Sequence, residues 1–354
     1  MPAPQFHLTF GELVASHPGV HPEVRSAVEA EPVYAHLGSI FHDLPYYGNV
    51  VGETVRYAFR RPAIDQPWAY RMHCIRPDRF AAAYIRSARL TPGLNDRERL
   101  ALVAGLLSHC ALDLTLHPLV NYCARRDTAL LGGHETFHHR ITEKYHALFF
   151  HLERYGDDVL GHKSMLEKTR VVKQGHGRRS TAEPEIVAFM REAYRHAYGN
   201  APAGDTWTRW VLNFRHFGVA VAGKLTRRNS LKVRENESFY TRYYRSDDFD
   251  FNAFYVHSER RVAELVNLAH AYFTAGDFSP EAEARFCEAS RIDNLAEPDG
   301  AGLPTLPALP AHVAKKPLRL PLPPLPLPRL KKKTVLRNQS SARRDAEATD
   351  HRAA

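Results

Sequence analysis

The strongest hydrophobic pattern in the chain is a long apolar stretch in its N-terminal half. Asn95 and Glu98 have the spacing of a capping box, and the residues that follow, LALVAGLLSHCALDLTLHPLV, are apolar nearly all round until Pro118. A helix without a polar face belongs inside a protein. The pattern therefore predicts a buried central helix.

A second helix is predicted over residues 134–155 (HETFHHRITEKYHALFFHLERY), with Gly132, Gly133 and Gly156 as its boundaries. Further helical stretches are predicted over residues 22–31, 77–88, 185–198 and 259–275. Strand-like alternation is scarce. The sequence therefore predicts an all-α fold, a single multi-helix domain with long connecting loops.

Composition describes a soluble chain rather than a disulfide miniprotein or a fibrous repeat. The 354 residues are 44% hydrophobic and 25% charged, and the four cysteines include no Cys-x-x-Cys pair. Reduced, structural thiols are expected. The N-terminus has no basic region followed by an apolar run, and no stretch of about 18 apolar residues occurs. We therefore expect a cytoplasmic protein, in solution or peripheral to a membrane, without a transmembrane segment.

The net charge of +9 is concentrated at the C-terminus. Residues 301–354 hold eleven Lys and Arg against three Asp and Glu, and nine prolines lie between Pro304 and Pro328. Proline removes backbone donors and forbids helix, which predicts polyproline II followed by disorder. We predict a globular domain over residues 1–292 and a basic, Pro-rich disordered tail over residues 293–354. The near-neutral body argues against duplex nucleic acid, whereas the tail is expected to contact an acidic partner or an anionic membrane.

Polar residues interrupt the predicted central helix at His109, Asp113 and His117. At about 100° per residue, positions four apart share one stripe of a helix. A buried carboxylate costs several kcal/mol unless a cation compensates it. The stripe therefore points to a bound divalent metal.

The second helix repeats this spacing with His139 and Glu143. Asp43 lies in a predicted loop (GSIFHDLPYYG), and His73 lies just before another predicted helix. Thirteen of the 21 histidines fall within the first 151 residues. One isolated His-x-x-x-Asp pair is usually only hydrogen-bonded, but two such pairs on two apolar helices favour metal ligation by nitrogen and oxygen, which zinc, manganese or iron accepts.

The order of these motifs resembles the zinc-dependent phospholipase C family, whose superfamily includes the S1/P1 nucleases. The matching positions are His7, the G-x-x-x-x-D-L-P segment at 38–45, His73, His109-x-x-x-Asp113, His117 and His139-x-x-x-Glu143. The resemblance covers about the first 155 residues and implies a helical bundle.

The resemblance also implies the ligand sets. One zinc would lie among Asp43, His73, His109 and Asp113, and a second among His117, His139 and Glu143. The family's third zinc would use His7, Asp113 and the amine and carbonyl of a processed N-terminal tryptophan. This chain begins Met-Pro-Ala-Pro and offers no tryptophan there, so two zinc ions are expected, and a third would need another ligand or water in place of the tryptophan.

Closely spaced metals suit phosphoester hydrolysis because they lower the pKa of a bridging water toward about 7 and clamp the attacking and leaving oxygens. Asp43 is the expected catalytic residue, as both ligand and proton acceptor. The expected substrate is a phospholipid or a small phosphodiester, cleaved to a phosphomonoester and an alcohol.

Three alternatives stay open on the sequence alone. An S1/P1-like nuclease would use aromatics at 239–244 and cations at 227–234 to hold a strand. An HD-type phosphohydrolase would use the adjacent His42 and Asp43 as a metal-binding doublet. A non-catalytic, metal-stabilised helical protein would interact through its tail.

Overall fold

The computed structural model describes residues 4–59, 66–155, 172–174, 180–182, 184–214 and 237–309. The helices within these ranges are α1 (Pro4–Ser16), α2 (Pro22–Ala30), α3 (Pro32–Ile40), the 3-10 helix η1 (Phe41–Asn49), α4 (Val50–Ala58), α5 (Pro67–Cys74), α6 (Pro77–Leu90), α7 (Asp96–Leu131), α8 (Glu135–Tyr155), α10 (Pro184–Tyr198), α11 (Gly204–Asn213), α13 (Glu237–Tyr243), α14 (Phe251–Ala275) and α15 (Pro280–Ser290). Strand structure in the described residues consists of two short antiparallel hairpins, β1 (Val172–Gln174) with β2 (Ser180–Ala182) and β3 (Arg245–Ser246) with β4 (Phe249–Asp250). The predicted all-α fold is confirmed.

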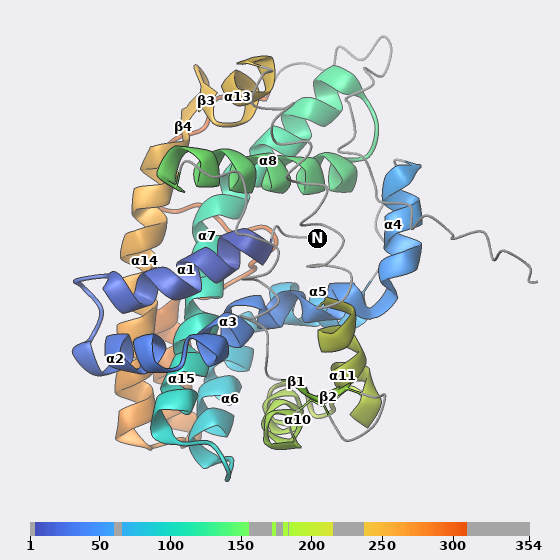
Figure 1. Cartoon of the computed structure of the whole chain (residues 1–354). Helices are drawn as coiled ribbons and strands as arrows, with labels where there is room; N and C mark the ends of the chain where they lie inside the picture. Colours follow the sequence, from blue (N-terminus) through green and yellow to red (C-terminus); the bar gives the residue numbers. More distant parts are fainter. Residues whose placement is uncertain are drawn as a thin grey trace, which may run out of the picture.

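Helix α7 forms the axis of the bundle (Figure 1). Its capping box is present: the Asn95 side chain accepts from Arg97 N and Glu98 N, and Glu98 accepts from Asn95 N. The helix continues through Pro118 to Leu131 rather than ending at the proline. An apolar 18-residue window of α7, with a mean hydropathy of 1.5, would suffice to cross a membrane, but it is entirely buried within the protein. As predicted from its lack of a polar face, α7 is the core helix.

Helices α3 and α7 approach each other closely through two glycines. A Cβ added at Gly38 would lie 2.2 Å from Leu102 O, and one added at Gly105 would lie 2.0 Å from Ala35 O. Only glycine permits these backbones to come so near. The contact matters for the site because α3 leads directly into η1, which carries Asp43.

The 3-10 helix η1 replaces the loop that the sequence predicted around Asp43. Pro45 lies inside it and cannot donate a helical hydrogen bond. The Phe41 ring is fully buried and stacks on the rings of Phe80 and Trp207, each with centroids 5.8 Å away. This anchor fixes the start of η1 and therefore the position of Asp43 two residues later.

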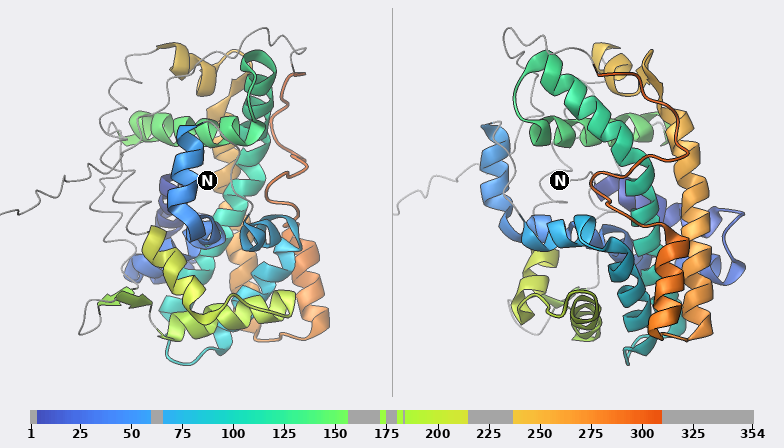
Figure 2. Two further views of the ribbon diagram at one scale, coloured as in Figure 1. Left: turned by 90° about the vertical axis from the view of Figure 1, so that its right-hand side faces the viewer. Right: turned by 180° about the vertical axis from the view of Figure 1, so that it is seen from behind.

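Beyond α15 the chain crosses α7 on the far side of the bundle (Figure 2, right). We call residues 292–303 the C-terminal strap. Its residues Ile292 and Leu295 are buried, and Leu303 packs against the core. Packing against the bundle therefore extends beyond residue 292, where the sequence placed the domain boundary, and the Pro-rich segment from residue 310 onward lies outside the described residues.

Candidate metal centre

The first group of polar side chains forms where η1, α5 and α7 meet. Asp43 comes from η1, His73 from the last turn of α5, and His109 and Asp113 from one face of α7. His73 Nε2 lies 3.5 Å from Asp43 Oδ1, and His109 Nε2 lies 3.1 Å from Asp113 Oδ2. Ligand atoms of Asp43, His73 and His109 all fall within 4.8 Å of one another, and the three side chains are buried. This spacing is small enough for one metal ion to touch all of them.

The second group lies one turn along α7, where α8 crosses it. Glu143 Oε1 lies 3.5 Å from His117 Nε2 and 3.1 Å from His139 Nε2. These atoms also fall within 4.8 Å of one another. His139 is the most exposed member, with 25% of its side chain accessible. The second group is therefore more open to solvent than the first.

Asp113 joins the two groups. Its Oδ2 lies 3.7 Å from His73 Nε2 and 3.1 Å from His109 Nε2, whereas its Oδ1 lies 3.6 Å from His117 Nε2. The carboxylate therefore reaches both groups: Oδ2 faces the first, and Oδ1 reaches His117 of the second. Such a carboxylate can hold two metal ions close together.

Histidines of the first group are oriented by backbone carbonyls within the N-terminal half. The Nδ1 of His109 lies 2.7 Å from Ser39 O, and that of His73 lies 2.8 Å from Ala69 O. Because a carbonyl only accepts, Nδ1 must carry the proton in each ring. Nε2 then presents its lone pair toward the carboxylates, which is the arrangement of a metal-ligating histidine.

Histidines of the second group are oriented in the same way by different partners. The Nδ1 of His117 donates to Leu295 O in the C-terminal strap. The Nδ1 of His139 lies 2.9 Å from Asn121 Oδ1, and Asn121 Nδ2 donates to Ala296 O at 2.8 Å. The second hydrogen bond fixes which end of the Asn121 amide faces His139, so Nδ1 carries a proton and Nε2 is left to face Glu143 Oε1 at 3.1 Å, or a metal between them.

Several buried ligand atoms have no hydrogen-bond partner. They are both oxygens of Asp43, Nε2 of His73 and His109, Oδ2 of Asp113 and Oε2 of Glu143. Leaving one buried polar group unpaired costs about 1–3 kcal/mol, and more for a charged group. Six such atoms directed at the same two spaces are well explained by bound cations.

The electrostatics of the site also call for positive charge. Burial acts to raise the pKa of Asp113, but His117 and His109 outweigh it and hold that pKa well below its usual value. Burial acts to lower the pKa of His117, but the carboxylates of Asp113 and Glu143 and the Leu295 carbonyl together outweigh it and raise that pKa to about 9. Without metal, protons therefore supply part of the positive charge, and a metal entering the site must displace them.

A model of the zinc-dependent phospholipase C family matches residues 6–203, more than half of the chain. The chain belongs to the zinc-dependent phospholipase C family. The matched range contains every residue that the sequence placed in the site. Comparisons with curated proteins and with solved structures each gave no match.

The donor set of this phospholipase C family member fits zinc. Imidazole nitrogen and carboxylate oxygen are ordinary zinc ligands, and the second group offers three of them. Three protein ligands leave a coordination position open, as in catalytic zinc sites, whereas structural sites are closed by four. Both the donor types and the unpaired buried atoms are therefore consistent with bound zinc. The number of ions stays a prediction.

His7, which the resemblance assigned to a third zinc, lies within the first group. Its Nε2 is 3.7 Å from Asp43 Oδ2 and 3.6 Å from Asp113 Oδ1, and its ring stacks on His109 with centroids 3.9 Å apart. Burial lowers the pKa of His7 to about 4, which keeps its ring neutral and suited to ligation. Its Nδ1 has no hydrogen-bond partner, unlike Nδ1 of the other histidines of the site. His7 is therefore placed as a ligand but lacks the fixed orientation of the others.

His42 does not join Asp43 at the metal centre. Among the described residues, the clusters with metal-ligand spacing do not include His42, whose ring stacks on that of His109 at 4.9 Å. Burial lowers the pKa of His42 well below its usual value, so the ring is neutral. This placement argues against the HD-type doublet and agrees with the phospholipase C family.

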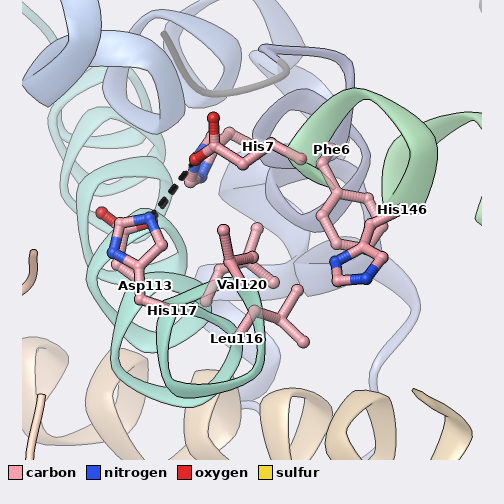
Figure 3. Close-up of a pocket in the computed structure, with 9 residues that line it drawn as sticks. Phe6, His7, Asp113, Leu116, His117, Val120 and His146 are labelled. Carbon is pink, nitrogen blue, oxygen red and sulfur yellow. Dashed lines mark ion pairs between the residues drawn. The ribbon is translucent and has the colours of Figure 1, made fainter. Parts of the chain in front are cut away.

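An apolar pocket borders the centre (Figure 3). Phe6, Leu116 and Val120 form its apolar wall, and Leu112 also lines it. His7, Asp113, His117 and Glu143 line the polar side. The metal ligands are therefore in contact with a recess that suits an apolar group.

The sequence did not reveal the residues that orient the ligands. Asn121 follows Pro118, where the predicted helix ended, and Leu295 lies in the predicted tail. The sequence also did not single out Arg140, a buried side chain of α8 that is paired with the buried Glu53 of α4. The i, i+4 spacing reveals ligands on one helix, but partners far apart in sequence leave no such signal.

Proposed function

We propose that this protein is a zinc-dependent hydrolase of phosphodiesters, acting on a phospholipid or a small organophosphate. One observation carries the proposal: two groups of histidine and carboxylate ligands share Asp113, and their buried ligand atoms lack other partners. The family assignment supports the same reaction class.

Zinc held between the two groups would supply Lewis acidity and an activated water at neutral pH. The chain's own contribution is to hold the reacting groups apart from bulk solvent and to move a proton. Asp43 is 1% exposed, and neither oxygen has a hydrogen-bond partner, so its carboxylate is free to accept the proton of the attacking water. The water oxygen bonds to phosphorus, the ester P–O bond breaks, and the leaving alkoxide takes up a proton. For a phospholipid, the products are a phosphorylated headgroup and diacylglycerol.

The surroundings of the centre favour an organophosphate with an apolar part over a nucleic acid strand. The pocket wall of Phe6, Leu116 and Val120 is apolar. Of the aromatics that a nuclease would use, Tyr243 and Tyr244 are buried in the core and offer no face for a base to stack on. The cations at 227–234 lie outside the described residues.

Metal analysis together with hydrolysis assays tests this proposal. The purified full chain should contain stoichiometric zinc and hydrolyse bis-p-nitrophenyl phosphate or phosphatidylcholine vesicles. His109→Ala should lose metal and activity, whereas His42→Ala should keep its metal because His42 lies outside the ligand clusters. Bound zinc with no turnover of any ester would instead support a non-catalytic helical protein. Loss of metal in His42→Ala would support the HD-type doublet.

The expected cytoplasmic location and the contact of the basic tail with an acidic partner or an anionic membrane also stay proposals. The tail contact rests on the +8 charge balance of residues 301–354, of which residues 310–354 lie outside the described residues. A vesicle-binding assay comparing phosphatidylserine with phosphatidylcholine would test the membrane contact. Binding independent of lipid charge would argue against it.

A further inference from the structure

The C-terminal strap makes hydrogen bonds to the metal centre that no other described segment outside residues 6–203 makes. Leu295 contributes both of its backbone polar groups. Its carbonyl accepts from His117 Nδ1, and its N–H donates to His73 O at 2.7 Å. Its side chain is fully buried. One residue thus connects the strap to a ligand of each group.

The next residue extends this connection to the remaining histidine of the second group. Ala296 O accepts from Asn121 Nδ2, and Asn121 Oδ1 accepts from His139 Nδ1. Both histidines of the second group therefore depend on strap carbonyls, one directly and one through Asn121. The ring of His73, in contrast, is oriented by Ala69 O of its own helix, and that of His109 by Ser39 O.

We infer that the C-terminal strap is a positioning element for the second metal group, so that affinity at His117, His139 and Glu143 depends on its docking. This inference rests on the proposed function, because it takes the two groups as metal sites. Partners that orient a ligating histidine affect metal affinity by about 10- to 100-fold. The strap should therefore control the second ion and leave the first largely unaffected.

Leu295 is the fully buried anchor of the strap, and Ile292 is buried nearby in the sequence. Arg125 adds an ion pair with Glu297 at 2.6 Å, but both side chains are largely exposed, at 43% and 64%. Exposed pairs contribute little because water and salt screen them. A substitution at Leu295 is thus the most direct way to release the strap without touching any ligand.

Leu295→Asp in the full chain places a carboxylate where the side chain is fully buried, and it should detach the strap. Leu309→Asp is the matched control, because it makes the same change at a leucine that lies beyond the strap and is 47% exposed. The measurements are zinc content, the visible absorption of the cobalt-substituted protein and the rate at which a chelator removes the metal. None of these depends on hydrolytic activity.

Leu295→Asp should lose one class of ion about 10- to 100-fold faster than the parent and match the metal deficit of His139→Ala. Leu309→Asp should behave like the parent. Should Leu295→Asp fail to fold, Leu295→Ala, which removes the anchor without burying a charge, decides the question by the same readouts. Metal release unchanged in a folded Leu295 variant would overturn the inference while leaving the proposed function intact. A parent chain that binds no metal would instead refute the proposed function itself.

Discussion

The two ligand groups of the metal centre are alike in chemistry but differ in what supports them. The first group, around Asp43 and His109, is oriented by oxygens of α3 and α5 in the matched region. The second group, around His117 and His139, is oriented by the strap near the C-terminus. The ligands of one motif can therefore lie close together in sequence, while the oxygens that orient its histidines lie far away in the chain. One group should therefore behave as part of the bundle, and the other as dependent on a late segment of the chain.

The largest effect is expected at Asp113, whose carboxylate contacts histidines of both groups. Asp113→Asn replaces the carboxylate that faces both groups by a neutral amide. Both ions should therefore be lost, and ester hydrolysis should fall about 10³-fold. Zinc content and turnover measure this directly. Retention of both ions would show that Asp113 does not bridge them.

Asp127→Asn is a matched control in the same helix. Asp127 is fully buried and accepts hydrogen bonds from Arg126, Arg242 and Tyr243, away from the ligands. Breaking this buried network should lower stability by about 3–5 kcal/mol while leaving metal stoichiometry intact in the folded fraction.

A second substitution should disturb the first group selectively. In Gly105→Ala the new Cβ would lie 2.0 Å from Ala35 O and 2.8 Å from Ser39 N, so α3 and α7 must move apart. We expect a loss of about 1–3 kcal/mol in the free energy of unfolding, measured in urea. Because Ser39 O orients His109, metal release from the first group should also accelerate, which is the reverse of the pattern expected for Leu295→Asp.

Gly52→Ala in α4 is the corresponding control. The atoms nearest its Cβ would be those of the Asn49 side chain, which is exposed, so turning it away costs one exposed hydrogen bond from Gly52 N. Equal effects of the two substitutions would mean that the close approach of α3 and α7 does not hold the first group.

A pH measurement examines His146, which lines the apolar pocket beside the second group. Burial lowers the pKa of His146 to about 3, below the 6.5 of the unfolded chain. Between these values the unfolded state binds the proton and the folded state does not, so stability falls as pH decreases from about 6.5. In the metal-free protein His146 should account for about 2 kcal/mol of the loss between pH 7 and pH 5. His146→Leu should reduce the loss of unfolding free energy between pH 7 and pH 5 by that amount, and an unchanged loss would contradict the burial of a neutral ring.

The sequence predicted helix α7 and its ligands well, but it did not predict the C-terminal strap. The apolar run before Pro118 and the capping box at Asn95 predicted α7 because both signals are local. The spacing of His109, Asp113 and His117 placed ligands on one face of that helix for the same reason. Asp43 was predicted in a loop, since neither Pro45 nor the short apolar stretch before it signals a 3-10 helix.

The strap was not predicted because residues 292–303 show no helical periodicity and lead directly into the Pro-rich segment. Leu295 has no periodic apolar neighbours, and its two hydrogen bonds to the site come from its backbone, which no residue type reveals. Pro118 gave a similarly misleading signal: the helix tolerates it and extends to Leu131, bringing Asn121 and Arg125 to the strap. The hydrogen bond between His117 Nδ1 and Leu295 O joins residues 178 positions apart. Tertiary packing determines such a contact, and it leaves no pattern in the sequence.

The smallest effect is expected from the exposed anchor of the strap. Arg125→Ala removes ion pairs with Glu135 at 3.1 Å and with Glu297 at 2.6 Å. Exposed pairs contribute about 0–1 kcal/mol, so the unfolding free energy should change by no more than that, and zinc release from the second group should stay within about twofold of the parent. High salt should reproduce the variant's behaviour in the parent, because screening weakens the same pairs. A large acceleration of zinc release in Arg125→Ala would mean that the strap is held by charge rather than by the buried Leu295, and the contrast between the two groups would then depend on ionic strength.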